Sequence, residues 1–328
     1  MKARTCVVFG GSGYIGTKLA ERLLQNKSFD RLYVFDLNPS GLAGERLVSR
    51  IADVRRLIEQ EIDDFDPDSS WVVDLAAVHR EPGHEPREYF DTNVTGAHSV
   101  TSFAERLGFK NLFFMSSIAP YGRSLEERTE ASPLYAETPY GISKALAEKI
   151  HEVWLARDSA RRVVICRPGV VYGPGDPGNM LRMIRALRRG TFVFPGPPSV
   201  VKAYGYVYGL VDSMEFVMAK TDRFIVYNYA EYPAHPLGEL VAEIKSIFGI
   251  RRATPRIPMA VLVASAAVIQ AAQAACGKAG AIHPMRVRKA AFPTNIKPDY
   301  LIRSGFEFKY DFSTSLHHWR TIAPADFA

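Results

Sequence analysis

The chain has 328 residues, of which 47% are hydrophobic and 23% are charged, and its formal net charge is +6. Its size exceeds one average domain, and its composition is ordinary for a soluble globular enzyme with a large buried core. The mild positive excess suits an anionic small substrate. The sequence contains no block of lysine and arginine with interleaved aromatic residues, so it does not indicate nucleic acid as a partner.

The N-terminal residues predict a strand, a glycine turn and a helix in succession. The apolar run Cys6–Phe9 meets Gly10, Gly13 and Gly16, and a helical pattern extends from Tyr14 to Leu24. Glycines let a turn adopt unusual dihedral angles and let the backbone approach a pyrophosphate. The helix N-terminus supplies N–H groups and partial positive charge. The alternative interpretation is a glycine turn without a ligand.

An acidic residue follows this turn at an informative distance. The predicted strand Arg31–Asp36 ends in a carboxylate twenty residues after Gly16. That is about the spacing at which an acid holds the 2′-hydroxyl of a ribose. Because Asp36 would repel a 2′-phosphate, the pattern favours NAD over NADP as the cofactor.

Strand and helix patterns alternate through the first half of the chain. Apolar strand runs lie at Cys6–Phe9, Leu32–Phe35, Trp71–Leu75, Leu112–Met115 and Val163–Cys166. Helical stretches between them include Arg87–Leu107 and Tyr140–Ala156. This alternation predicts an α/β fold, a Rossmann-like doubly wound parallel sheet with helices on both faces. Ligands of such sheets bind beyond the carboxyl ends of the strands, where Gly13, Asp36 and Ser117 would meet.

The stretch Tyr140–Lys144 places a phenol and an ammonium four residues apart. On a helix these two side chains share a face. A tyrosine loses its proton only near pH 10, but a neighbouring cation favours the phenolate and lowers that pKa. The pair is therefore a candidate proton carrier for alcohol–carbonyl chemistry. Alone the pattern means little, since most such pairs are solvated helix surface.

Taken together, these motifs resemble the extended short-chain dehydrogenase/reductase superfamily, over roughly residues 4–250. Within it, the pattern resembles the nucleotide-sugar epimerase/dehydratase branch and its UDP-hexose 4-epimerases. Further matching stretches are Asp53–Val54, Asp74–Ala77, Asn93–Gly96, Met115–Gly122 and Arg167–Pro174. The resemblance implies NAD contacts at Gly10, Gly13, Tyr14, Ile15, Gly16, Asp36, Asp53, Val54, Leu75, Ala76, Ala77, Asn93, Tyr140, Lys144, Pro168 and Val170.

The resemblance also implies three catalytic residues. Tyr140 is the acid and base, and Lys144 lowers its pKa and hydrogen-bonds the nicotinamide ribose. Ser117 hydrogen-bonds the substrate oxygen as it becomes a ketone, with Ser116 as the rival for this role. Asn93 is read either as a structural helix residue or as one that shapes the site indirectly.

Contacts to the substrate are predicted at His79, Asn179, Lys202 and Arg286, with Arg288 as an alternative to Arg286. The loop with His79 faces the substrate in relatives, and Asn179 matches an asparagine that meets the nucleotide diphosphate in that branch. Lys202 stands near a position where an arginine often contacts the phosphates, and Arg286 or Arg288 would supply the second cation. A cationic clamp suits a diphosphate, although each basic residue could equally be exposed surface. No metal site is predicted, because no further ligand accompanies His79 and His84, and Cys6, Cys166 and Cys276 have no zinc spacing.

Two domains are expected, with residues 1–174 binding NAD and residues 175–328 forming mainly a smaller, interleaved substrate lobe. Proline and glycine cluster at Gly173–Gly178 and Phe194–Pro198, which reads as loops over a cleft. Two candidate strands, Tyr204–Leu210 and Phe224–Asn228, would return from the lobe to the sheet.

The segment Ile257–Gly277 contains no charged residue. It has the length of a membrane span, but it is rich in alanine and includes Gln270 and Gln273. It is read first as a buried or oligomer-facing helix and second as a membrane-surface contact. The chain enters its first strand within five residues, without a signal peptide, so a cytoplasmic location is expected. The family resemblance implies a homodimer.

The leading hypothesis is an NAD-dependent nucleotide-hexose 4-epimerase that works through a transient 4-keto intermediate. Dehydration is disfavoured, because Ile118 and Ala119 occupy the places of the Asp-Glu pair of sugar dehydratases. The alternative is a net dehydrogenase or reductase of a keto-sugar or a sterol-like hydroxy compound. A non-catalytic dinucleotide sensor is disfavoured, because Ser117, Tyr140 and Lys144 are all present.

Overall fold

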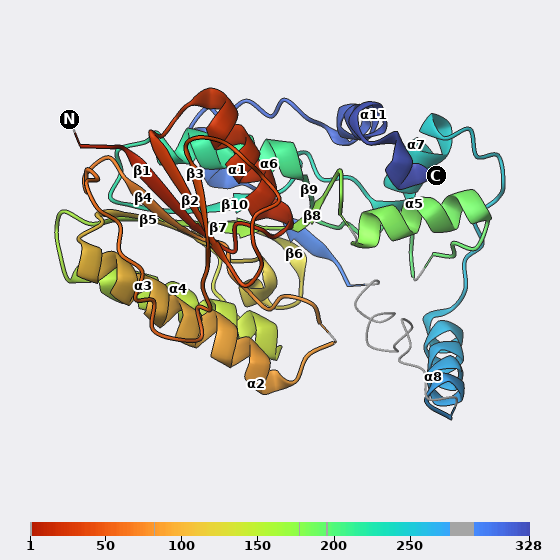
Figure 1. Cartoon of the computed structure of the whole chain (residues 1–328). Helices are drawn as coiled ribbons and strands as arrows, with labels where there is room; N and C mark the ends of the chain where they lie inside the picture. Colours follow the sequence, from red (N-terminus) through yellow and green to blue (C-terminus); the bar gives the residue numbers. More distant parts are fainter. Residues whose placement is uncertain (1, 82, 177, 195, 276–291) are drawn as a thin grey trace.

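A parallel sheet of seven strands forms the centre of the molecule (Figure 1). The computed structural model describes residues 2–81, 83–176, 178–194, 196–275 and 292–328. The strand order is β10-β7-β5-β4-β1-β2-β3, and every pair is parallel. The strands are β1 (Thr5–Phe9), β2 (Arg31–Asp36), β3 (Leu47–Ile51), β4 (Trp71–Asp74), β5 (Asn111–Met115), β7 (Arg162–Pro168) and β10 (Phe224–Tyr229). The predicted Rossmann-like fold is confirmed.

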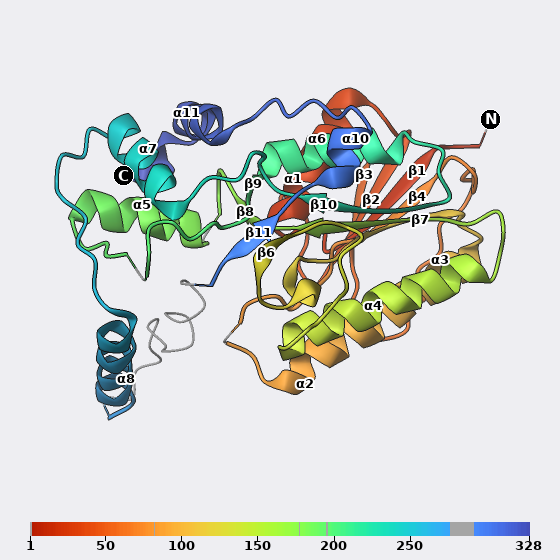
Figure 2. The same cartoon turned by 180° about the vertical axis from the view of Figure 1, so that it is seen from behind.

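Helices cover both faces of this sheet (Figures 1 and 2). On one face, α1 (Tyr14–Asn26) and α6 (Val207–Met218) bury a shared apolar layer. On the other, α3 (Thr95–Leu107) and α4 (Pro139–Ala156) bury a second layer. Because both faces are covered, the central strands are apolar along their whole length, which explains why their sequence runs were recognisable.

The chain order reverses between β1 and β4, which are neighbours in the sheet although β2 and β3 come between them in the sequence. Such a switch point opens a crevice at the carboxyl ends of the two strands. Gly10 follows β1 and Leu75 follows β4, so both predicted cofactor motifs lie at this crevice.

The helix predicted over Arg87–Leu107 has three parts. It comprises α2 (Pro86–Tyr89), a π-helical turn (Phe90–Val94) and α3. A π turn inserts one extra residue per turn and often accompanies a functional side chain. Here the turn contains Asn93, whose side chain is buried.

The C-terminal lobe has a core of its own. Its helices are α5 (Asn179–Arg189), α7 (Leu237–Ile247), α11 (Phe312–Ile322) and a 3₁₀ turn (Pro324–Phe327). Their shared core includes Ile184, Leu187, Leu240, Leu316 and Trp319. Apart from α8 (Met259–Ala275), the other elements of the described residues are two small sheets, one short helix and one 3₁₀ turn. They are β6 (Ser124–Arg128) with β11 (Thr294–Ile296), β8 (Val170–Tyr172) with β9 (Tyr204–Tyr206), α10 (Asp299–Arg303) and Ala119–Tyr121.

The two candidate returning strands differ. Phe224–Asn228 lies in β10, which pairs with β7 at the edge of the central sheet. The strand predicted over Tyr204–Leu210 forms only over Tyr204–Tyr206, and its predicted return to the central sheet is wrong, because β9 pairs with β8 instead. Buried residues of α6 recur at a helical spacing (Val207, Leu210, Val211, Met214 and Val217). That spacing outweighs the strand propensity of the aromatic residues before it.

The uncharged segment forms α8 (Met259–Ala275), with Cys276 and Gly277 outside the described residues. The expectation that the chain itself buries this helix is wrong, because Val261 is 52% exposed and Val268 69% exposed. Figures 1 and 2 both draw α8 projecting from the body of the molecule. Within the described ranges, no helix has the length and apolar character needed to cross a bilayer.

Candidate active site

The glycine turn between β1 and α1 is closely packed against the end of β4. Gly10 has a φ of +72°, and a Cβ there would lie 2.8 Å from the Ala76 nitrogen. A Cβ on Gly16 would lie 2.4 Å from the Gly10 carbonyl oxygen. Gly13 precedes α1 without a side-chain cap, so the first N–H groups of the helix face the crevice uncovered. This backbone cradle fits the pyrophosphate of a dinucleotide.

Asp36 lies beside this turn at the end of β2. Its carboxylate accepts hydrogen bonds from the backbone nitrogens of Ser12, at 3.1 Å, and Asn38, at 3.0 Å. These bonds fix the carboxylate at the rim of the crevice, where an adenosine ribose would lie in a dinucleotide.

Asp53 and Val54 follow β3 on the same rim. The Arg55 guanidinium binds the Asp53 carboxylate at 2.9 and 2.7 Å, and this hydrogen bonding holds the pKa of Asp53 below its usual value. Val54 packs against Gly96 of α3, where a Cβ would lie 2.9 Å from its Cγ2. The small residue at position 96 therefore lets α3 approach this rim.

Asn93 ties the loop after β4 to α4. Its Oδ1 accepts from the Val78 nitrogen and its Nδ2 donates to the Val78 carbonyl, both at 3.0 Å. Nδ2 also donates to Ser143 Oγ at 2.9 Å. Because the side chain spends its polar atoms on these neighbours, Asn93 fits the indirect, site-shaping role better than a direct cofactor contact.

Tyr140 and Lys144 project from the first turns of α4. Thr138 caps this helix by accepting a hydrogen bond from the Gly141 nitrogen at 3.1 Å. Lys144 is buried, and its Nζ donates to the Met115 carbonyl at 2.8 Å and lies 4.6 Å from the centre of the Phe114 ring. Burial lowers the pKa of Lys144 to about 8, although the charges of Asp74 and Glu148 oppose this shift.

Ser117, and not Ser116, is next to Tyr140. Burial raises the pKa of Tyr140, whereas its hydrogen bond with Ser117 lowers it. Lys144 is not among the groups that shift this pKa, so the expected lowering by the lysine is absent from this arrangement. The Ser116 hydroxyl is turned inward and donates to Glu148 Oε1 at 2.5 Å.

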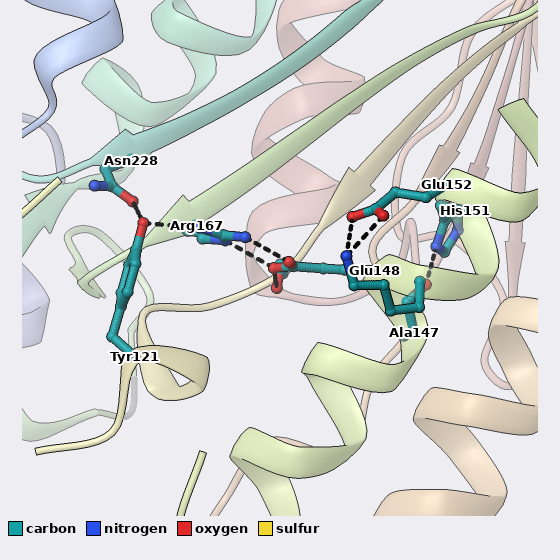
Figure 3. Close-up of polar contacts among 9 residues, drawn as sticks. Tyr121, Ala147, Glu148, His151, Glu152, Arg167 and Asn228 are labelled. Atoms are coloured by element: carbon teal, nitrogen blue, oxygen red, sulfur yellow. Dashed lines mark hydrogen bonds and ion pairs between the residues drawn. The ribbon is translucent and has the colours of Figure 1, made fainter. Parts of the chain in front are cut away.

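A buried polar network lies behind these residues (Figure 3). Arg167 donates to both carboxylate oxygens of Glu148, at 2.9 and 2.7 Å, and to the Tyr121 hydroxyl at 3.0 Å. Tyr121 in turn donates to Asn228 Oδ1 at 2.7 Å. The network joins α4 to β7 and β10. Sequence analysis missed Glu148, although an acid one helical turn after Lys144 on the same face was the signal for it.

His151 and Asp74 form a second buried pair beneath Lys144. His151 stacks on Phe114 at 4.2 Å between ring centres, and its Nδ1 donates to the Ala147 carbonyl at 2.7 Å. Its Nε2 lies 3.7 Å from Asp74 Oδ2. Burial lowers the pKa of His151 to about 3 and raises that of Asp74 to about 6, so a neutral imidazole faces the carboxyl group.

The predicted substrate residues come from separate elements. His79 is exposed in the loop after β4, and its pKa is lowered by partial desolvation and by the charges of Arg80 and Lys144. Asn179 begins α5 and accepts from Arg182 at 2.8 Å. Lys202 is half-buried beside β11, and burial lowers its pKa to about 8. Arg286 and Arg288 lie outside the described residues.

Pro168 and Val170 connect β7 with the small β8–β9 sheet. The Pro168 carbonyl accepts from the Ile118 nitrogen at 3.1 Å, and the Val170 nitrogen donates to the Ala203 carbonyl at 2.8 Å. The first bond holds the residue after Ser117 against the end of β7, so Pro168 borders the serine, whereas the second bond ties Val170 to the residue before β9.

A family model described as the NAD dependent epimerase/dehydratase family matches residues 6–230. The chain belongs to this family. The match covers every element that builds the site up to β10, and it confirms both the resemblance and NAD as the cofactor. Among the described residues of this family member, no group of three or more histidine, cysteine or acidic side chains is arranged to hold a metal ion.

Similar proteins include two that are named as 4-epimerases. The chain is 28% identical over 314 residues to the N-acetyl-alpha-D-glucosaminyl-diphospho-ditrans,octacis-undecaprenol 4-epimerase of Escherichia coli O157:H7, covering 94% of this chain and 92% of that protein. It is 28% identical over 286 residues to UDP-glucose 4-epimerase 2 of Arabidopsis thaliana, covering 75% and 81%.

Solved structures support the fold. The enzyme WbmG of Bordetella bronchiseptica, in complex with NAD and UDP, superposes with a TM-score of 0.74 at 20% identity, covering 100% of this chain and 98% of that one. MoeE5, in complex with UDP-glucuronic acid and NAD, gives a TM-score of 0.72 at 22% identity, covering 97% and 99%.

Proposed function

We propose that this family member is a 4-epimerase of a hexose carried on a diphosphate. The observation that carries the proposal is the grouping of Ser117, Tyr140 and Lys144 at the crevice bordered by the glycine turn. Ile118 and Ala119 supply no acid to protonate a leaving hydroxyl, so inversion is favoured over dehydration.

NAD, when bound, supplies the hydride acceptor and returns the hydride. Tyr140 removes the proton from the sugar hydroxyl and later gives it back. Ser117, which already hydrogen-bonds Tyr140, donates to the same sugar oxygen and steadies its charge in the keto intermediate. Inversion follows when the keto sugar turns in the site and receives the hydride on its other face.

Lys144 contributes a buried positive charge below Tyr140. Its pKa of about 8 keeps most of the ammonium protonated at pH 7, while its position against Met115 and Phe114 holds it close to the reacting rim. Because Lys144 does not shift the Tyr140 pKa in this arrangement, we assign its ammonium to the ribose hydroxyls of the nicotinamide nucleotide, which it would hold beside the phenol.

The cofactor would lie along the glycine turn, with Asp36 at the ribose and the helix α1 N-terminus at the pyrophosphate. Asp53 and Val54 border the adenine end, and Leu75, Ala76 and Ala77 line the floor. His79, Asn179, Lys202 and Arg286 are assigned to the substrate, with the two cations directed at its diphosphate.

Two sources of that diphosphate are consistent with the relatives. The Arabidopsis thaliana relative is named for UDP-glucose, and the Escherichia coli O157:H7 relative for an undecaprenol diphosphate. The latter similarity covers 94% of this chain and 92% of that protein. The shared chemistry is a hexose diphosphate whose C4 hydroxyl is inverted.

We also propose a homodimer formed through α3 and α4. A groove between these helices is lined by residues such as Val94, His98 and Ile150. Leu146 and Val153, beside it, are 45% and 55% exposed. Apolar side chains open on two adjacent helices suit a second copy of the same pair.

The test compares Tyr140→Phe with Tyr135→Phe, which changes a phenol that is 62% exposed. We expect Tyr140→Phe to lose at least about a hundredfold in turnover while NAD still binds, and Tyr135→Phe to keep wild-type turnover. Substrate is offered either as a UDP-hexose or as a polyprenyl diphosphate hexose, and the products are separated by chromatography. Full turnover by Tyr140→Phe on either substrate would refute the proposal.

A further inference from the structure

One face of α8 is apolar and open. Val261 and Val268, seven residues apart, lie on the same side of the helix, with Ala264 and Ser265 between them, and all four are exposed. Leu262, Val263 and Ala266 turn to the covered side. We call the side formed by Val261, Ala264, Ser265 and Val268 the open face of α8. No charged residue occurs anywhere in the helix.

The described helix is too short to cross a membrane. Its 17 residues extend about 25 Å at 1.5 Å per residue, whereas the hydrocarbon core of a bilayer is about 30 Å thick. An apolar helix of this length outside the protein core can instead lie along a membrane surface with one face buried.

Exposed arginines lie before α8. Arg251, Arg252 and Arg256 come three to eight residues before Met259, and all three are exposed. A Cβ on Gly190 would lie 2.6 Å from the Arg252 guanidinium, so Arg252 is beside the end of α5. The last turn of α5 adds two further exposed arginines, Arg188 and Arg189. Among the described residues, none of these five arginines forms an ion pair with a carboxylate.

The geometry points to α8 as the element by which the protein binds an anionic membrane surface. Its open face would enter the boundary between headgroups and acyl chains, and the five arginines would meet phosphate headgroups. A membrane fits better than the α8 of a second copy, because α8 carries no carboxylate that could meet these arginines.

This location matters for the substrate, and here the inference rests on the proposed function. A protein held on the membrane by its substrate lobe would meet a sugar diphosphate whose carrier is a lipid. The inference therefore favours the lipid-linked source over the soluble nucleotide sugar.

The test measures co-sedimentation of the full chain with phosphatidylcholine vesicles that either contain or lack phosphatidylglycerol. Val268→Glu is compared with Leu57→Glu, which makes the same charge change at a side chain 72% exposed on the NAD-binding part. We expect the wild type to bind the anionic vesicles more tightly, and less so at high salt. Val268→Glu should weaken binding at least about tenfold, and Leu57→Glu should not.

A double variant, Arg251→Gln with Arg252→Gln, should weaken binding to anionic vesicles only. The inference is overturned if the wild type does not sediment with anionic vesicles, or if Val268→Glu sediments like Leu57→Glu. It is also overturned if Val268→Glu lowers the molecular mass in solution without altering sedimentation, because α8 would then cover a second copy. Since Tyr140→Phe should sediment normally, failure here is distinct from failure of the proposed epimerase activity.

Discussion

Helices α4 and α8 are almost equal in length, with 18 and 17 residues, but they use their side chains in opposite ways. The first buries Lys144, Glu148 and His151, three titratable groups, whereas the second exposes Val261 and Val268. From hydrophobicity alone, α8 would be expected inside the protein and α4 at its surface. What decides burial is whether the neighbouring elements provide partners for the polar groups.

This difference between the buried polar groups of α4 and the exposed apolar groups of α8 relates to function. The polar groups of α4 are held by hydrogen bonds with β5, β7 and the π-helical turn Phe90–Val94. A catalytic set requires that fixity. A membrane surface, as proposed here for α8, needs only an apolar area with cations beside it.

The largest expected effect comes from breaking the pair behind the catalytic residues. Glu148→Gln leaves the buried Arg167 without its carboxylate and should lower the free energy of unfolding by about 3–5 kcal/mol. Glu152→Gln is the control on the same helix, because the ion pair of Glu152 with Lys149 is solvent-exposed and should cost less than about 1 kcal/mol. Urea denaturation of both variants measures the difference. Equal losses in the free energy of unfolding for the two variants would mean that burial does not determine how much an ion pair stabilises the protein.

A buried carboxyl group in the lobe gives a pH dependence. Glu231 accepts a hydrogen bond from Tyr172, and burial raises its pKa to about 8. Because the folded-state pKa lies above the ordinary value, this group contributes stability below about pH 4.5 and loses it as the pH rises toward 8. Between about pH 4.5 and 8, the free energy of unfolding of the wild type should therefore fall by on the order of a few kcal/mol relative to that of Glu231→Gln. The measurement is urea denaturation of both proteins at several pH values. A difference in the free energy of unfolding that stays constant across these pH values would contradict this expectation.

The glycine turn is tested by adding one methyl group. Gly16→Ala places a Cβ against the Gly10 carbonyl, which must move, and NAD affinity should fall about a hundredfold, equivalent to about 2.7 kcal/mol. Gly41→Ala is the control, because a Cβ there has no neighbour within 4 Å. Titration calorimetry with NAD compares the two variants, and unchanged affinity in Gly16→Ala would show that the turn is not the cofactor cradle.

The smallest effect is expected on α8. Val268→Glu should change the free energy of unfolding by no more than about 0.5 kcal/mol, because the side chain is 69% exposed. The measurement is urea denaturation without lipid. A large loss would mean that the open face is packed in solution and would weaken the contrast with α4.

Much of the site could be read from the sequence because its determinants are local. The spacing of Gly10, Gly13 and Gly16 encodes a turn, and the spacing of Tyr140 and Lys144 encodes a shared helix face. Five apolar runs predicted five strands of the central sheet, since buried parallel strands carry no polar interruptions. The edge strand β3 has no such signature, because four of its five residues are exposed.

Other features depend on residues far apart in the chain. The pair of Glu148 with Arg167 and Tyr121, the choice of Ser117 over Ser116, and the end of β9 at Tyr206 all depend on which elements pack together. The exposure of α8 is of the same kind, since its composition is compatible with a protein core, a partner or a membrane surface. The sequence by itself determined the cofactor turn and the order of the elements, because short-range sterics and periodicity fix them. Only the tertiary structure decided which polar groups find partners and which apolar faces stay open, because partners for both come from distant segments.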